Sequence, residues 1–203
     1  NIANIDRYRP IYHYLQGKCY FQKKSMRKAK SSFLKAIMYI HQDTNSEMVN
    51  LKATCLNELG RIANAEGNLE EALQYTQEGI QSFREDGERE YVLYSLMTNQ
   101  AIYLEELGLL ERSLKTIQEI KRVQNGMKNL DGALSLFDLE SRILNKNHMY
   151  SQAISLVKEG IELARINHMN DRSFALWKTF GNIYYDMNRL EEAKICYCTA
   201  LDL

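Results

Sequence analysis

A fixed spacing of small residues constrains the fold of this chain more than any other feature. Five segments align on a small residue, and the steps between them are 43, 41, 40 and 40 residues: Gly17, Gly60, Ala101, Ser141 and Gly181. A second small residue follows each of these register residues twelve positions later: Ala29, Ala72, Ser113, Ala153 and Ala193. Repeats of this length predict supersecondary units that stack on their neighbours.

Within each unit, apolar residues recur at spacings of three and four, which predicts two amphipathic helices. In the second repeat, one helix carries Leu56, Leu59 and Ile62, and its partner carries Leu73 and Ile80. A glycine inside a helix costs about 1 kcal/mol relative to alanine, so the recurring small residue indicates close helix packing. Turns are predicted at matching places: Gly67-Asn68, Gly108, Asn147-His148 and Met187-Asn188.

The same register carries the pattern of a known repeat. The fifth unit shows it most clearly, as Trp177, Phe180-Gly181, Tyr184, Ala193, Tyr197 and Ala200. This pattern resembles the tetratricopeptide repeat, and the resemblance extends over roughly residues 10 to 203. It implies an all-α fold, a right-handed superhelical solenoid of about five helical hairpins.

We expect this solenoid to form a single domain over residues 1–203. The expected repeats are 10–42, 47–84, 88–125, 129–168 and 170–203. Their period of 40 to 43 residues exceeds the usual 34 or so, and the closing proline is missing, which predicts lengthened helices. Because the chain begins without methionine and stops at Leu203, we expect a fragment of a longer protein.

The lengthened units resemble those of the RRNPP family, the Rap, NprR, PlcR and PrgX type of peptide-sensing regulators in Gram-positive bacteria. They also resemble kinesin light chain and LGN-type adaptors. The abundant Lys, Asn, Ile and Tyr and the single proline favour the bacterial family, with the NprR type, a transcription regulator linked to sporulation, as the nearest. This resemblance implies a quorum-sensing domain that binds a short signalling peptide and switches an attached output domain. The alternative is a constitutive adaptor or scaffold.

In such a solenoid the first helix of each hairpin lines the inner face, where extended peptides bind. Side-chain amides there can both donate to and accept from a peptide backbone, and basic groups can bind a carboxylate. The predicted peptide-binding residues are Asn57, Arg61, Asn64, Thr98, Asn99, Asp138, Arg142, Asn145, Lys178, Asn182 and Tyr185. The competing interpretation is that asparagine favours exposed positions in any case. Lys178 and Asn182 also resemble half of a chaperone-binding carboxylate clamp, but the other half is absent.

Charge is distributed unevenly although it sums to zero. Residues 1–42 carry nine basic side chains against Asp6, a surplus of eight that the rest of the chain balances. We expect an acidic partner at this basic N-terminal hairpin, or DNA bound through a domain that this chain does not contain. A homo-oligomer is also expected, because the outer apolar face of the last helix needs a cover.

Signals for catalysis, metals and membranes are missing from the sequence. The chain contains no Walker loop, dinucleotide-binding glycine pattern or nucleophile elbow, and its four histidines (His13, His41, His148 and His168) lack metal-ligand spacing. Cys196 and Cys198 are expected on different helix faces. We therefore expect no enzyme activity, metal or cofactor. Four irregularly spaced cysteines, with no signal peptide and no apolar run that spans a bilayer, favour the cytoplasm.

Overall fold

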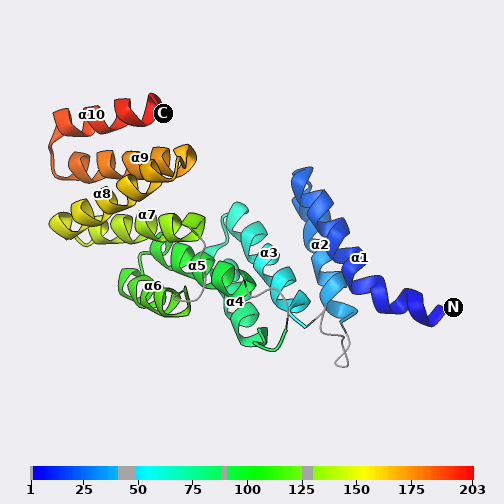
Figure 1. Cartoon of the computed structure of the whole chain (residues 1–203). Helices are drawn as coiled ribbons and strands as arrows, with labels where there is room; N and C mark the ends of the chain where they lie inside the picture. The colour runs from blue at the N-terminus through cyan, green and yellow to red at the C-terminus, as the bar shows by residue number, and fades with distance from the viewer. Residues whose placement is uncertain (1, 41–48, 88–90, 125–129) are drawn as a thin grey trace. The chain divides into compact units, whose positions relative to one another are not determined.

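The computed structural model describes residues 2–40, 49–87, 91–124 and 130–203 (Figure 1). Within these ranges the chain is entirely helical, with ten helices and no strand, which confirms the predicted fold class. The first helices of the successive hairpins are α1 (Ile2–Gln22), α3 (Leu51–Ala65), α5 (Tyr91–Glu106), α7 (Leu130–Lys146) and α9 (Asn170–Asp186). The second helices are α2 (Met26–Met38), α4 (Leu69–Ser82), α6 (Leu110–Gln124), α8 (Tyr150–Ile166) and α10 (Leu190–Leu201).

The chain divides into two compact units, residues 1–107 and 108–203. The first unit contains hairpins α1/α2 and α3/α4 together with α5, and the second contains α6 with hairpins α7/α8 and α9/α10. The division falls inside the third expected repeat. That the whole chain forms one solenoid domain, with the repeat limits given above, stays a prediction.

Each unit has its own apolar core, built from the predicted helix faces. In the first unit, Phe33, Leu51, Leu59 and Ile62 are fully buried. In the second unit the core is built around Leu134, Val157, Leu176 and Ile183. In both units the recurring small residues lie within this packing, since Ala29, Ala72, Ala153 and Ala193 are all buried.

The register glycines lie where two helices of a hairpin approach most closely. A Cβ atom added to Gly17 would lie 2.6 Å from Cε1 of Phe33, and one added to Gly60 would lie 3.3 Å from the carbonyl oxygen of Ala72. Ala101 and Ser141 occupy the same register and are also fully buried. The structure therefore confirms that the small residues serve close packing.

Left-handed backbone conformations confirm the four predicted turns. Gly67 and Gly108 have φ angles of 80° and 75°, and His148 and Asn188 have φ angles of 59° and 60°. A residue in this conformation commonly ends a helix, because it lets the chain reverse while the last carbonyls find partners. Lys24 and His168 adopt it too, at the α1/α2 and α8/α9 connections.

The first helix begins earlier than the expected repeat limit, and several expected limits fall outside the described residues. Helix α1 begins at Ile2, well before residue 10, and it accommodates Pro10 in its interior. His41 and the expected repeat limits at 42, 47, 88, 125 and 129 lie outside the described residues. None of the described helices is both long and apolar enough to cross a membrane.

Candidate peptide-binding site

The structure places every predicted peptide-binding residue on a first helix. Helices α3 and α5, in the first unit, carry Asn57, Arg61, Asn64, Thr98 and Asn99. Helices α7 and α9, in the second unit, carry Asp138, Arg142, Asn145, Lys178, Asn182 and Tyr185. The candidate site therefore consists of two sets of side chains, one on the first helices of each unit.

In the first unit, an amide pair joins neighbouring repeats. Nδ2 of Asn99 donates to Oδ1 of Asn57 at 2.8 Å, across a separation of 42 residues. This bond uses one polar atom of each side chain. Nδ2 of Asn57 and Oδ1 of Asn99 are not consumed by it, and an amide offers both functions to a peptide backbone.

A buried carboxylate links the first two repeats. Glu58 is only 5% exposed, and its two oxygens accept from Nζ of Lys18 at 2.8 Å and from Nη1 of Arg61 at 2.9 Å. The guanidinium of Arg61 also lies 4.9 Å from the ring centre of Phe21. Two charge-assisted hydrogen bonds compensate the burial of the Glu58 charge. Arg61 is thus held in place by the protein itself.

In the second unit, Asp138 lies at the centre of a similar arrangement. Its Oδ1 accepts a hydrogen bond from Oγ1 of Thr179, 41 residues later, and its Oδ2 lies 3.8 Å from Nη1 of Arg142. Asp131 receives two hydrogen bonds of 2.6 Å from Arg172, again 41 residues later. The hydrogen bond from Arg172 is the main reason that the pKa of Asp131 lies below its usual value.

Asn145 is the most constrained of the predicted residues. Nδ2 of Asn145 donates to Oδ2 of Asp186 at 2.6 Å, which fixes the orientation of the amide. The residue is 7% exposed, and its Oδ1 is buried without a hydrogen-bond partner among the described residues. A buried acceptor without a partner costs about 1–3 kcal/mol. This oxygen keeps an unused acceptor position, although the surrounding protein covers it.

The remaining predicted residues are not brought into these clusters. Asn182 accepts a hydrogen bond of 2.8 Å from the hydroxyl of Tyr197, inside its own hairpin. Lys178 and Tyr185 are exposed on α9, and Asn64 is half-buried on α3. The hydroxyl of Thr98 is buried and has no hydrogen-bond partner among the described residues.

Sequence reasoning missed several polar residues that organise the first helices. The missed residues are Glu58, Asp131, Arg172, Thr179 and Asp186. A signal for two of them was present, because Glu58 and Thr179 both stand two positions before a register glycine, as Asn99 stands two positions before Ala101. Reading that whole column of the repeat would have identified them.

A sequence profile described as tetratricopeptide repeat matches residues 11–40 and 176–203. These two segments are similar to the tetratricopeptide repeat. They contain the second half of α1 with all of α2, and most of α9 with all of α10, so the matched segments lie in both compact units. No curated protein matches the chain.

Solved structures of tetratricopeptide type share the fold. A putative kinesin light chain from Podospora anserina has 14% identity and a TM-score of 0.71 over 97% of this chain and 94% of its own. A Rap protein complexed with competence and sporulation factor has 12% identity and a TM-score of 0.73 over 97% of this chain. YrrB, a tetratricopeptide protein with an unusual peptide-binding site, has 13% identity and a TM-score of 0.60 over 94% of this chain and 84% of its own. The alignment spans about half of the Rap chain, 53%.

Proposed function

We propose that this chain is the peptide-binding domain of a regulator that responds to a short signalling peptide. The peptide binds in extended form along the first helices of one unit, and its backbone N–H and C=O groups meet the asparagine side chains there, on α3 and α5 in the first unit or on α7 and α9 in the second. Lys178, exposed on α9, supplies positive charge for a carboxylate of the peptide, whereas Arg61 and Arg142 already lie beside carboxylates of the protein. The tetratricopeptide fold and its likeness to a Rap protein solved with a signalling factor support this assignment.

The single observation that carries the proposal is the buried Oδ1 of Asn145, which has no partner among the described residues. Asp186 already orients the amide, so the cost of ordering this side chain is met before any ligand arrives. A peptide N–H that reaches this oxygen removes the penalty of an unsatisfied buried acceptor. The oxygen is covered in this structure, so a peptide N–H reaches it once the neighbouring side chains move aside.

The bonds between repeats suggest how binding acts on an output. Asn57–Asn99 and Asp138–Thr179 each join first helices of consecutive repeats. A peptide that competes for these polar atoms changes the bonds that set the spacing of the repeats. A ligand shifts a conformational equilibrium only through its different affinities for the two states, and these shared atoms provide that difference.

The second candidate function is a constitutive adaptor that joins proteins without switching. The observation in its favour is that the same polar side chains are already bonded inside the protein, as expected for a rigid surface. The likeness to a kinesin light chain fits this alternative equally well. Small-angle scattering separates the two candidates, because a switch changes its radius of gyration on binding and an adaptor does not.

Native mass spectrometry with a mixture of random-sequence heptapeptides tests the proposal. We expect discrete peptide adducts on the wild-type chain, and we expect the Asn145→Ala variant to lose them. The matched control is Gln152→Ala, because Gln152 is exposed on α8, in the same unit but on a second helix. A wild-type chain that retains no peptide, or equal retention by Asn145→Ala, contradicts the assignment.

Further expectations are part of this proposal. Family resemblance is the basis for four of these expectations. They are a role in quorum sensing, transcription and sporulation, the NprR type, a cytoplasmic location, and DNA contact through a domain outside this chain. Self-association has one supporting observation, since Leu190, Ile195 and Leu201 are each more than half exposed on α10. The absence of enzyme activity, metal and cofactor also stays a prediction.

A further inference from the structure

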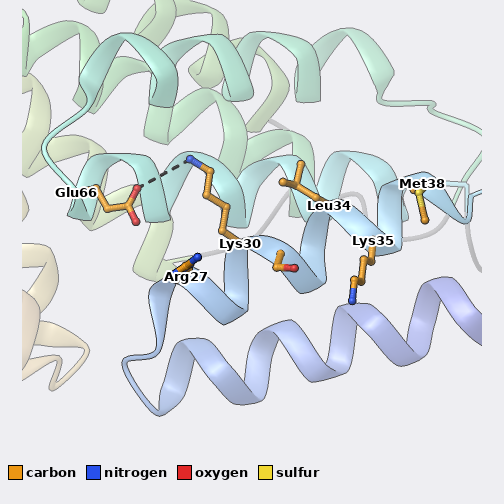
Figure 2. Close-up of a pocket in the computed structure, with 7 residues that line it drawn as sticks. Arg27, Lys30, Leu34, Lys35, Met38 and Glu66 are labelled. Atoms are coloured by element: carbon orange, nitrogen blue, oxygen red, sulfur yellow. Dashed lines mark ion pairs between the residues drawn. The ribbon is translucent and has the colours of Figure 1, made fainter.

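The outer side of α2 carries a pocket that the proposed peptide site does not use. The pocket has a volume of about 610 Å³, and six of its seven lining residues come from α2: Arg27, Lys30, Ser31, Leu34, Lys35 and Met38. Glu66, at the end of α3, is the seventh (Figure 2). All seven belong to the first unit, and α2 is a second helix, whereas every predicted peptide-binding residue lies on a first helix.

The lining combines exposed apolar side chains with positive charge. Leu34 is 45% exposed and Met38 is 66% exposed, although both side chains are large and apolar. Helix α2 contains four basic residues and no acidic one. Ser31 is small and exposed between Arg27 and Leu34, so it leaves the floor of the pocket open.

Only one of the three cations that line the pocket is neutralised by the described protein. Nζ of Lys30 lies 2.9 Å from Oε1 of Glu71 and 4.0 Å from Oε2 of Glu66, as Figure 2 shows for Glu66. Among the described residues, the side chains of Arg27 and Lys35 make no ion pair or hydrogen bond. Two of the three positive charges at the pocket thus lack a carboxylate partner in the part of the chain that the structure describes.

We propose that this pocket binds an acidic segment of a partner protein that carries an apolar side chain between two carboxylates. Arg27 and Lys35 are eight residues apart on one helix, about 12 Å along its axis. In an extended segment, positions i and i+4 are separated by about 13 Å and point the same way as position i+2. A segment with carboxylates at i and i+4 and leucine at i+2 thus matches Arg27, Ser31 with Leu34, and Lys35.

Charge complementarity favours an acidic protein segment over nucleic acid or a lipid surface. Glu66 lines the pocket and Glu71 lies beside Lys30, so a continuous row of phosphates would meet two carboxylates. A phosphate row also has no group to cover Leu34 and Met38. A protein segment can place its charges at the two ends and a neutral residue near Glu66.

A defined probe tests this inference by fluorescence anisotropy with the whole 203-residue chain. The probe is fluorescein-Gly-Ser-Glu-Thr-Leu-Thr-Glu-Ser-Gly, which places leucine between two glutamates. We expect saturable binding, and replacing both glutamates of the probe with glutamine is expected to lower affinity about tenfold, or about 1.4 kcal/mol. Replacing the leucine with serine is expected to lower it also.

Matched charge reversals in the protein locate the binding. The double variant Arg27→Glu with Lys35→Glu is expected to lower affinity by tenfold or so through lost attraction and added repulsion. The control is Lys23→Glu with Lys28→Glu, which changes the net charge equally on exposed residues of the same hairpin that do not line the pocket. We expect this control to bind the probe as the wild type does.

Three outcomes overturn the inference. They are no binding of the probe at millimolar concentration, equal losses in the two double variants, and tight binding of phosphatidylserine vesicles or duplex DNA in place of the probe. None of them bears on Asn145, which lies in the other unit, so the proposed peptide site is tested separately.

Discussion

The amide of Asn99 donates a 2.8 Å hydrogen bond to Asn57, which lies one repeat earlier. In the second unit, Thr179 donates to Asp138 across the same repeat distance. Each donor stands two positions before the register residue of its repeat. Each acceptor stands three positions before the register residue of the preceding repeat. The recurrence of one bond in both units indicates that the period in the sequence is also the period of the polar contacts between first helices.

The Asn57–Asn99 pair is expected to contribute to stability as a coupled unit. Asn57→Ala and Asn99→Ala should each lower the free energy of unfolding by about 1 kcal/mol, and the double variant should lose less than the sum. Urea denaturation followed by circular dichroism measures all three. Asn64→Ala on the same helix is the control, and a similar loss there would show that the pairing itself is not responsible.

At the register position, glycine and alanine are expected not to be interchangeable, so exchanging them lowers stability in either direction. In Gly181→Ala, the new methyl group overlaps the ring of Tyr197, whose hydroxyl is bonded to Asn182. We expect a net loss of about 1–3 kcal/mol despite the better helix propensity of alanine.

The reciprocal change is Ala101→Gly in the third repeat, where the alanine is fully buried. It is expected to cost about 1 kcal/mol, because glycine is the poorer helix former and no overlap is relieved. Thermal unfolding of both variants checks the pair of predictions. A stabilised Gly181→Ala variant would contradict the close packing of α9 on α10.

The Lys30–Glu71 pair is expected to make the free energy of unfolding depend on pH in the acid range. The hydrogen bond from Lys30 lowers the pKa of Glu71 below its usual value of 4.5. Because this pKa is lowered, the contribution of the pair to the free energy of unfolding is present at pH values above the usual pKa. It is lost as pH falls through the folded-state pKa of Glu71. Urea midpoints measured from neutral to acid pH should fall less steeply for Glu71→Gln. Glu70→Gln, its exposed neighbour, should behave as the wild type; equal slopes for all three would remove this assignment.

Tyr103 is expected to make the free energy of unfolding depend on pH in the alkaline range. Burial raises the pKa of Tyr103 from 10.0 to about 12. The contribution of the buried Tyr103 hydroxyl to the free energy of unfolding is therefore complete below pH 10.0. It is lost as pH rises towards about 12, a loss of up to roughly 2–3 kcal/mol. Denaturation at alkaline pH should show a smaller decline for Tyr103→Phe. Ultraviolet titration that finds all tyrosines ionising together in the folded chain would contradict this account.

Much of the fold follows from the sequence because its signals are local and repeated. The spacing of Gly17, Gly60 and Gly181 predicts the close helix pairs, and the turn residues predict the left-handed positions at Gly67 and Asn188. Each signal recurs in several units, so chance agreement is excluded by repetition. The helical hairpin is a structure that such local signals suffice to specify.

The candidate site is less predictable because its contacts join different repeats. Asn145 was predicted, but its partner Asp186 lies 41 residues away, and no local pattern names it. The two hydrogen bonds of 2.9 Å that tie Asn50 to the backbone of Arg84 were missed for the same reason. The pocket on α2 depends on which side of the helix faces solvent. In the sequence, its basic residues indicated only a surplus of positive charge.

The most direct test of the central claim is the affinity of the wild-type chain and of Asn145→Ala for the heptapeptide retained most strongly by the wild type. Isothermal titration calorimetry gives both affinities. We expect a loss of about 10- to 100-fold for Asn145→Ala, the equivalent of one buried hydrogen bond, with Gln152→Ala unchanged. Equal affinities for Asn145→Ala and the wild type would contradict it.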